Sequence, residues 1–103
     1  WSEEMANHAK DCDLLFLESN YDERMLAAGP YPYWLKKRIS DNFGHLSNKQ
    51  AREFLEHCGY GCERPVYLVH LSANNNKVEL AAKAMEGFNA FVCPRGEQVT
   101  GEF

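Results

Sequence analysis

The residues best suited to chemistry are one carboxylate and two imidazoles that stand near the ends of apolar stretches. Glu18 ends one such stretch, His70 lies near the end of a second, and His45 lies in a loop between them. In an open parallel sheet, ligands bind beyond the carboxyl ends of the strands. If both stretches form parallel strands, these three side chains meet at one sheet edge, where acid–base or metal-binding chemistry needs such groups.

Each of the three residues also has a simpler structural explanation. Glu18 could cap a helix or face solvent, as most single acidic residues at strand ends do. His45, beside a glycine, could be an ordinary loop residue. His70, in an apolar stretch, could be a core histidine with satisfied hydrogen bonds. Only the expected convergence of all three favours a functional site.

The strands that would position these residues are marked by apolar runs. Leu14 to Leu17 is a continuous apolar run, which is typical of a strand buried on both faces. Val66 to Leu71 is the second strong run, and two shorter stretches follow toward the C-terminus. The predicted strands are Asp13–Glu18, Val66–Leu71 and Asn89–Cys93, with a short edge strand at Gln98–Phe103.

Helix signals lie between the strands. Ser47 and Gln50 form a capping box at the start of one helix, and Gly59 ends that helix. Gly29 is expected as a left-handed cap. The predicted helices are Ser2–Lys10, Asp22–Ala28, Tyr33–Ile39, Ser47–Cys58 and Lys77–Glu86. Strands that alternate with helices predict an α/β fold with a mostly parallel sheet.

Length and composition fit one globular domain covering residues 1–103. Hydrophobic residues make up 45% and charged residues 25%, and the formal net charge is -4. An acidic balance gives no support to phosphate binding by a basic surface, although a metal site would add local positive charge. No export signal or membrane span is recognised, so a cytoplasmic protein with four reduced cysteines is expected.

Several motifs together resemble the YycJ-type proteins of the metallo-β-lactamase fold. The resemblance runs in order over nearly the whole chain. The pieces that carry it are Asp13 to Asp22, Met25-Leu26, Gly29-Pro30-Tyr31-Pro32, Leu35 to Ile39, Gly44-His45-Leu46-Ser47-Asn48, and His70-Leu71-Ser72 with Asn74-Asn75 and the helix from Val78. The Gly-Pro-Tyr-Pro and Gly-His-Leu-Ser-Asn pieces are the most specific.

This resemblance implies a fold and roles for the three residues. The fold is an αββα sandwich, and the chain would be its C-terminal half, with an antiparallel edge at the C-terminus. Family members are metal-dependent hydrolases related to RNase Z and RNase J. By similarity to RNase Z, His45 would donate a proton to the leaving group and Glu18 would orient it. His70 would be a metal ligand, for zinc or manganese in a two-metal site.

The departures from the family pattern limit what this chain could do alone. The main metal motif, His-x-His-x-Asp-His, is absent, as are a middle ligand histidine and a bridging aspartate. One ligand cannot hold a zinc ion, which needs three or four. The isolated chain is therefore expected to be inactive, and its partner would be an N-terminal half carrying that motif. The absence of an initiator Met fits a processed or cut chain, and whether Trp1 is the natural start stays open.

The parent protein is thus expected to be a phosphodiesterase or nuclease-like hydrolase. DNA, RNA, a cyclic nucleotide and a small phosphodiester all remain open as substrates. The alternative is a non-catalytic binding or regulatory module that retains half of the fold. A half-sandwich would also expose apolar sheet surface, so self-association is expected.

Three other features have weaker functional interpretations. Cys58 and Cys62 have a spacing compatible with zinc, but no second pair follows, so a structural role is favoured. The aromatic residues at 31, 33 and 34 could stack bases, although packing around two prolines is the preferred interpretation. The basic triplet at 36–38 is expected to be a solvated helix face.

Overall fold

The computed structural model describes residues 1–40 and 45–93. It contains a three-stranded sheet in the order β1-β2-β3, formed by β1 (Leu15–Glu18), β2 (Pro65–Val69) and β3 (Asn89–Val92). Both strand pairs are parallel. The expected parallel pairing of the first two strands is therefore confirmed, whereas the predicted edge strand Gln98–Phe103 lies outside the described residues.

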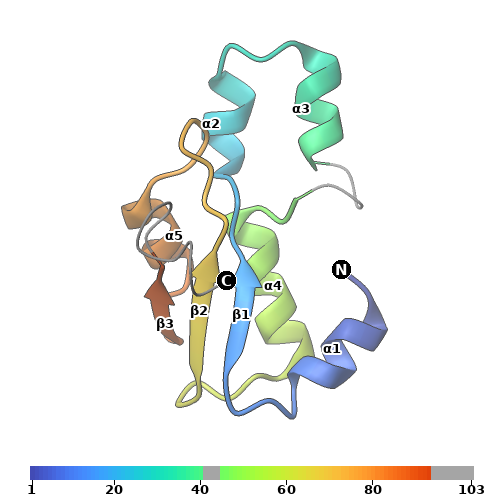
Figure 1. The fold of residues 1–103 in the computed structure, drawn as a ribbon, viewed down its shortest axis with the longest axis vertical. Coiled ribbons are helices and arrows are strands. Elements are labelled where there is room, and N and C mark those ends of the chain that lie inside the picture. The colour runs from blue at the N-terminus through green and yellow to red at the C-terminus, as the bar shows by residue number, and fades with distance from the viewer. Residues whose placement is uncertain (41–44, 94–103) are drawn as a thin grey trace, which may run out of the picture.

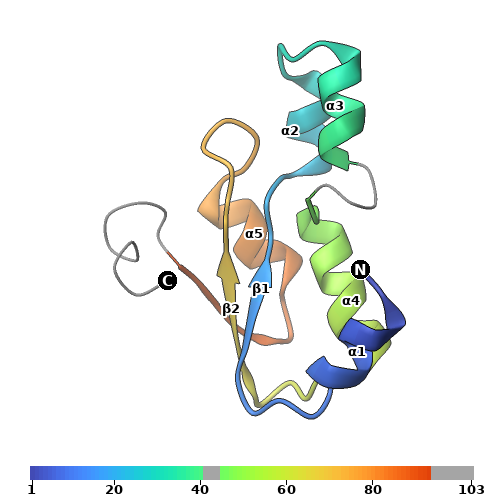
Figure 2. The same ribbon diagram turned by 45° about the vertical axis from the view of Figure 1, so that its right-hand side comes forward.

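Five helices occur in the described part of the chain, close to the predicted positions. They are α1 (Glu3–Ala9), α2 (Glu23–Ala28), α3 (Tyr33–Ser40), α4 (Asn48–Cys58) and α5 (Val78–Ala84). Helices α2 and α3 lie together beyond the carboxyl ends of β1 and β2, away from the other helices (Figures 1 and 2). None of the helices described is long and apolar enough to span a membrane.

One face of the sheet carries the hydrophobic core. Every second strand residue points to the same face, which places Leu17, Val66 and Leu68 against the helices. Helix α4 contributes Phe54 and Leu55 to the same cluster. The remaining buried members come from α1, α5 and the neighbouring loops, namely Ala6, Ala9, Ala51, Cys58, Tyr60, Leu71, Ala81 and Met85.

The opposite face of the sheet carries a row of aromatic side chains. The strand register pairs Phe16 with Tyr67 and Tyr67 with Phe91. Their rings stack in sequence, with 5.3 Å between neighbouring centroids. Phe16 is 49% exposed and Phe91 is 47% exposed. The expectation that these strands would be buried on both faces is wrong for this chain, because the alternation of side chains turns every second apolar residue away from its helices.

The ends of two helices show where local sequence signals succeed and fail. Ser47 Oγ accepts a hydrogen bond from the Gln50 amide at 3.0 Å, and Gln50 Oε1 accepts one from the Ser47 amide at 2.9 Å, so the capping box is confirmed. Gly59 ends α4 with a φ of 71°, in the left-handed region. Gly29, however, is extended rather than left-handed. Pro30 follows it, and a residue before proline is driven to extended backbone.

Candidate functional site at the carboxyl ends of the strands

Glu18 and His45 form the centre of the candidate site. Glu18 is the last residue of β1, and its Oε2 lies 2.7 Å from His45 Nδ1. The same oxygen accepts a hydrogen bond from the Leu46 amide at 3.2 Å. An ionised carboxylate only accepts hydrogen bonds, so Nδ1 carries the proton and Nε2 is left for other partners. The expected hydrogen bond between these two side chains is therefore present.

His70 lies on the other side of the same carboxylate. Its Nδ1 is 3.7 Å from Glu18 Oε1, and its side chain is 71% exposed, as expected for a residue that points out of the strand end. The predicted strand Val66–Leu71 is too long, because β2 ends at Val69 and His70 turns to a φ of 60°. The Asn20 side-chain amide donates to the His70 carbonyl at 2.6 Å and holds this turn.

A buried cluster of polar side chains lies directly behind the site. Ser19 Oγ donates to Asn48 Oδ1 at 2.5 Å, and the Asn48 amide donates to Asn76 Oδ1 at 2.8 Å. The Asn76 amide in turn donates to the Ser19 carbonyl and to Asn48 Oδ1, each at 2.9 Å. All three residues are at least 96% buried. Buried polar groups that are fully paired in this way fix one arrangement of the segments that carry them.

These three polar residues tie together the segments that present the site. Ser19 follows Glu18 on the chain, and Asn48 begins α4 just after His45. Asn76 lies near the end of the loop between β2 and α5. The role of Asn76 was not predicted from the sequence. A run of amides just after a strand is the signal that could have pointed to it.

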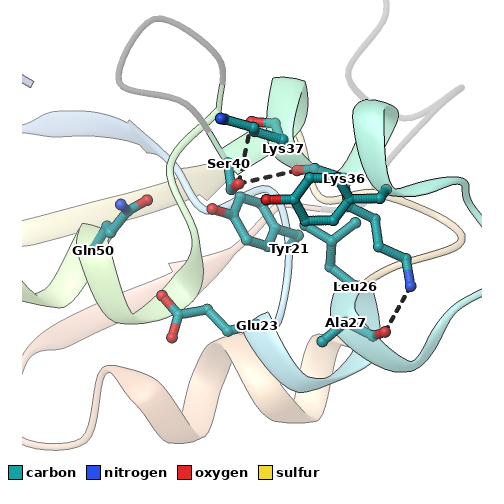
Figure 3. Close-up of a pocket in the computed structure, with 9 residues that line it drawn as sticks. Tyr21, Glu23, Leu26, Ala27, Lys36, Lys37, Ser40 and Gln50 are labelled. Atoms are coloured by element: carbon teal, nitrogen blue, oxygen red, sulfur yellow. Dashed lines mark hydrogen bonds between the residues drawn. The ribbon is translucent and has the colours of Figure 1, made fainter.

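A cleft of about 560 Å³ lies between α2 and α3, beside the start of α4. Tyr21 and Leu26 give it apolar walls, and polar groups reach it from Glu23, Lys37 and Gln50. The remaining lining residues are Ala27, Tyr33, Lys36 and Ser40. In Figure 3, Lys36 bends to the Ala27 carbonyl, whereas Glu23 and Gln50 lie on the other side of the Tyr21 ring.

Tyr21 links this cleft to the site. It is buried and forms a parallel bridge with Ser47, two residues after His45. Burial raises the pKa of the Tyr21 hydroxyl, and the negative charges of Glu23 and Glu18 raise it further, while a hydrogen bond with Ser47 opposes them. The raised pKa keeps the Tyr21 hydroxyl protonated at neutral pH.

The aromatic residues of α3 do not pack as expected. Tyr33 is 77% exposed and Trp34 is 64% exposed, so packing around the prolines is the wrong interpretation for both. A helix on the strand-end side of the sheet, with little core beneath it, leaves them in contact with solvent. Tyr31 is partly buried, and its hydroxyl accepts a hydrogen bond from the Asn74 side chain at 3.3 Å.

The residues described do not form a complete metal site. Within residues 1–40 and 45–93, no three histidine, cysteine, aspartate or glutamate side chains come together in a metal-binding group. His70 offers an accessible imidazole but is a single ligand, and structural zinc needs four. Cys58 is buried and Cys62 is exposed. What the arrangement can do by itself is hold the His45 imidazole, aimed by a carboxylate, for proton transfer.

Comparison with known proteins found relatives that match most of this chain. Exodeoxyribonuclease WalJ of Streptococcus pneumoniae, in strains D39 and R6, is 37% identical over 84 residues, which are 82% of this chain and 31% of WalJ. Exodeoxyribonuclease YycJ of Bacillus anthracis is 36% identical over 80 residues, which are 78% of this chain and 30% of YycJ. The chain thus spans less than a third of the length of these curated relatives. No protein-family model matches it, and neither does any solved structure.

Proposed function

The chain is a homologue of the YycJ-type proteins, and from that premise we propose that it is one part of a metal-dependent exodeoxyribonuclease. The names of the relatives support a nuclease-like hydrolase. The observation that supports roles for particular residues is the 2.7 Å contact between Glu18 Oε2 and His45 Nδ1. This contact joins segments 27 residues apart at the sheet edge where an α/β protein binds its ligands.

In the proposed reaction, His45 is the general acid. A water oxygen adds to the phosphorus and gives up one proton to solvent, while the bond from phosphorus to the leaving oxygen breaks and that oxygen takes a proton from His45. Glu18 holds the imidazole in one orientation through the hydrogen bond to Nδ1. The buried contacts of Ser19, Asn48 and Asn76 keep both residues in register.

The metal is zinc or manganese in this proposal, and it would supply an activated water and hold phosphate oxygens. Of the residues described, His70 is the candidate ligand, since its ring is exposed at the strand end. Within residues 1–40 and 45–93, no three potential ligand side chains come together, so further ligands would be needed. We assign them to an N-terminal half with a His-x-His-x-Asp-His motif, and the greater length of the relatives supports this assignment.

The fold in this proposal is half of a metallo-β-lactamase αββα sandwich. The sheet of this chain has helices on one face and an exposed aromatic row on the other, as half of a sandwich should have. The second sheet and its helices would then cover the row formed by Phe16, Tyr67 and Phe91.

The proposal is tested by replacing His45 in the full-length protein encoded by the gene. We expect His45→Ala to lower the rate of DNA hydrolysis by about 10²- to 10⁴-fold while the metal content stays unchanged. The matched control is His57→Ala, because His57 is also exposed and paired with a glutamate, but on α4 away from the site. Rate and metal content are measured on the same preparations.

Three other results would contradict parts of the proposal. An unchanged rate would exclude His45 as the proton donor. Loss of metal on the His45 change would make His45 a ligand instead. A full-length protein that folds but hydrolyses no DNA, with any metal added, would favour the non-catalytic binding module.

A further inference from the structure

The cleft between α2 and α3 has no place in the reaction proposed above. We propose that it binds the base of a nucleotide in a single-stranded nucleic acid, held next to the reacting phosphate. That the strand is DNA rests on the proposed function. The location, the lining chemistry and the side chains at its rim each support it.

The location places the cleft beside the reacting groups. Tyr21, which forms one wall, lies three residues after Glu18 and is bridged to Ser47, two residues after His45. Helices α2 and α3 stand beyond the carboxyl ends of β1 and β2, the end of the sheet where Glu18 is found (Figure 1). A strand whose phosphate reaches His45 can therefore place a neighbouring base in the cleft.

The size and walls of the cleft suit a base. Its volume of about 560 Å³ falls within the range of roughly 300–1,000 Å³ that is usual for small-ligand sites. Tyr21 and Leu26 are buried and form the apolar floor of the cleft, and the exposed Tyr33 ring offers a face on which a base can stack. A base within a duplex is stacked and paired, so only an unpaired base could enter.

The polar groups of the cleft suit the edge of a base. Glu23 uses Oε2 to accept a hydrogen bond from Ser47 Oγ at 3.1 Å, and Gln50 uses Oε1 in the capping box. Within the described residues, Glu23 Oε1 and the Gln50 amide nitrogen have no such partner. A carboxylate oxygen that accepts and an amide that donates match the mixed donors and acceptors of a base edge.

The rim supplies a charge and an exposed ring. Lys36 is engaged, because its Nζ donates to the Ala27 carbonyl at 2.6 Å. Lys37 Nζ has no acceptor among the described side chains and carbonyls, so it can meet a phosphate oxygen. Tyr33 lines the cleft and is 77% exposed, which leaves its ring available for stacking.

Helix α3 offers matched controls for the test. Trp34 and Arg38 are exposed like Tyr33 and Lys37 and adjoin them in sequence, but they do not line the cleft. The probe is a 5′-phosphorylated deoxyadenosine trinucleotide, added to the chain in EDTA so that no hydrolysis occurs. Binding is followed by changes in the amide signals of a two-dimensional NMR spectrum, which also reports whether each variant is folded.

We expect Tyr33→Ala to weaken binding of the trinucleotide by about tenfold, since one stacked base is lost. Lys37→Ala should weaken it several-fold, whereas Trp34→Ala and Arg38→Ala should change it less than about twofold. The amide signals of Glu23, Leu26 and Gln50 should shift on binding. A trinucleotide that lacks its bases should also bind the unchanged chain about tenfold more weakly than the complete trinucleotide does. Its affinity should therefore be similar to that of the complete trinucleotide for Tyr33→Ala.

Equal losses for Tyr33→Ala and Trp34→Ala would overturn the proposal, because binding would then use the helix surface and not the cleft. Equal binding of the trinucleotide without bases would also overturn it, since only phosphates would be recognised. No binding at all would overturn it too. Because these measurements need neither metal nor turnover, they can fail or succeed independently of the proposed hydrolase activity.

Discussion

Glu18 places its two carboxylate oxygens near two histidines from different segments. The 2.7 Å distance to His45 Nδ1 is a hydrogen bond, whereas the 3.7 Å distance to His70 Nδ1 is too long to be one. The two histidines therefore stand in different relations to the carboxylate. His45 is held, and His70 is near a negative charge but able to turn toward another partner.

The difference between the two histidines leads to a prediction for metal binding. In the full-length protein, His70→Ala should weaken metal binding by at least about tenfold. Replacing a residue that only hydrogen-bonds to a metal ligand already lowers metal affinity about 10- to 100-fold, and loss of a ligand itself should lower it at least as much. Elemental analysis after dialysis against a weak chelator measures the effect. Glu3, the partner of His57, lies in α1 away from the site, so His57→Ala is the control. An unchanged metal stoichiometry for His70→Ala would refute the ligand role.

The different exposure of Cys58 and Cys62 predicts a difference in thiol reactivity. Burial raises the pKa of the Cys58 thiol, and its Sγ donates to the Leu55 carbonyl at 3.6 Å. Because the thiolate is the reactive form, iodoacetamide at pH 8 should modify exposed Cys62 several-fold faster than Cys58 in the folded chain. Mass spectrometry of the modified peptides measures both rates. In denaturant the two rates should become similar, and a fast Cys58 in the folded chain would contradict its burial.

Helix α4 is the element that brings His45 to Glu18. Its capping box fixes Ser47, and the backbone on both sides is pinned, since Asn20 N–H donates to the Leu46 carbonyl at 2.9 Å and Asn48 N–H to the Tyr21 carbonyl at 2.8 Å. The segment after β1 thus runs beside the segment before α4 for several residues. The site depends on this pairing as much as on the sheet itself.

The buried amide of Asn76 is expected to stabilise this arrangement. Asn76→Ala removes donors to the Ser19 carbonyl and to Asn48 Oδ1, so it should lower the free energy of unfolding by about 1–3 kcal/mol. Urea denaturation followed by circular dichroism measures the change. The control is Asn74→Ala, an exposed amide in the same run, which should cost less than about 0.5 kcal/mol. Equal costs for the two variants would mean that the buried contacts contribute little.

The whole molecule is a sheet with helices on one face and aromatic rings on the other. The row formed by Phe16, Tyr67 and Phe91 runs across all three strands, with Phe16 and Phe91 about half exposed. Contiguous apolar surface of this kind usually marks a contact with another chain or segment. In the protein proposed here the second half of a sandwich would meet this face.

The exposed row predicts self-association of the chain on its own. Light scattering should show a molecular mass that rises with concentration, and Phe91→Glu should reduce this rise by placing a charge in the apolar row. Met5→Glu is the matched control, because Met5 is similarly exposed on α1, away from the row. A chain that stays monomeric at all concentrations, with or without the Phe91 change, would contradict the prediction.

The sequence alone determined the order of the elements, the parallel pairing of the first two strands and the capping box of α4. The positions of the elements and the capping box depend on signals that act within a few residues, whereas the parallel pairing was inferred from the alternation of strands with helices. The expected meeting of strand ends pointed to Glu18, His45 and His70 as a set. The motif resemblance then suggested their roles, which remain predictions.

Which groups meet and which sheet face is exposed could be seen only in the folded chain. Whether an apolar strand face is covered depends on where distant helices pack, so Phe16 could not be placed from its own run. The extended backbone of Gly29 depends on the proline that follows it. The positive φ of His70 is held by the hydrogen bond from the Asn20 side chain to the His70 carbonyl. The buried network joins residues up to 57 positions apart, and the cleft between α2 and α3 also joins separate segments. Neither could be predicted from the sequence, because contacts across such distances form only once the chain has folded.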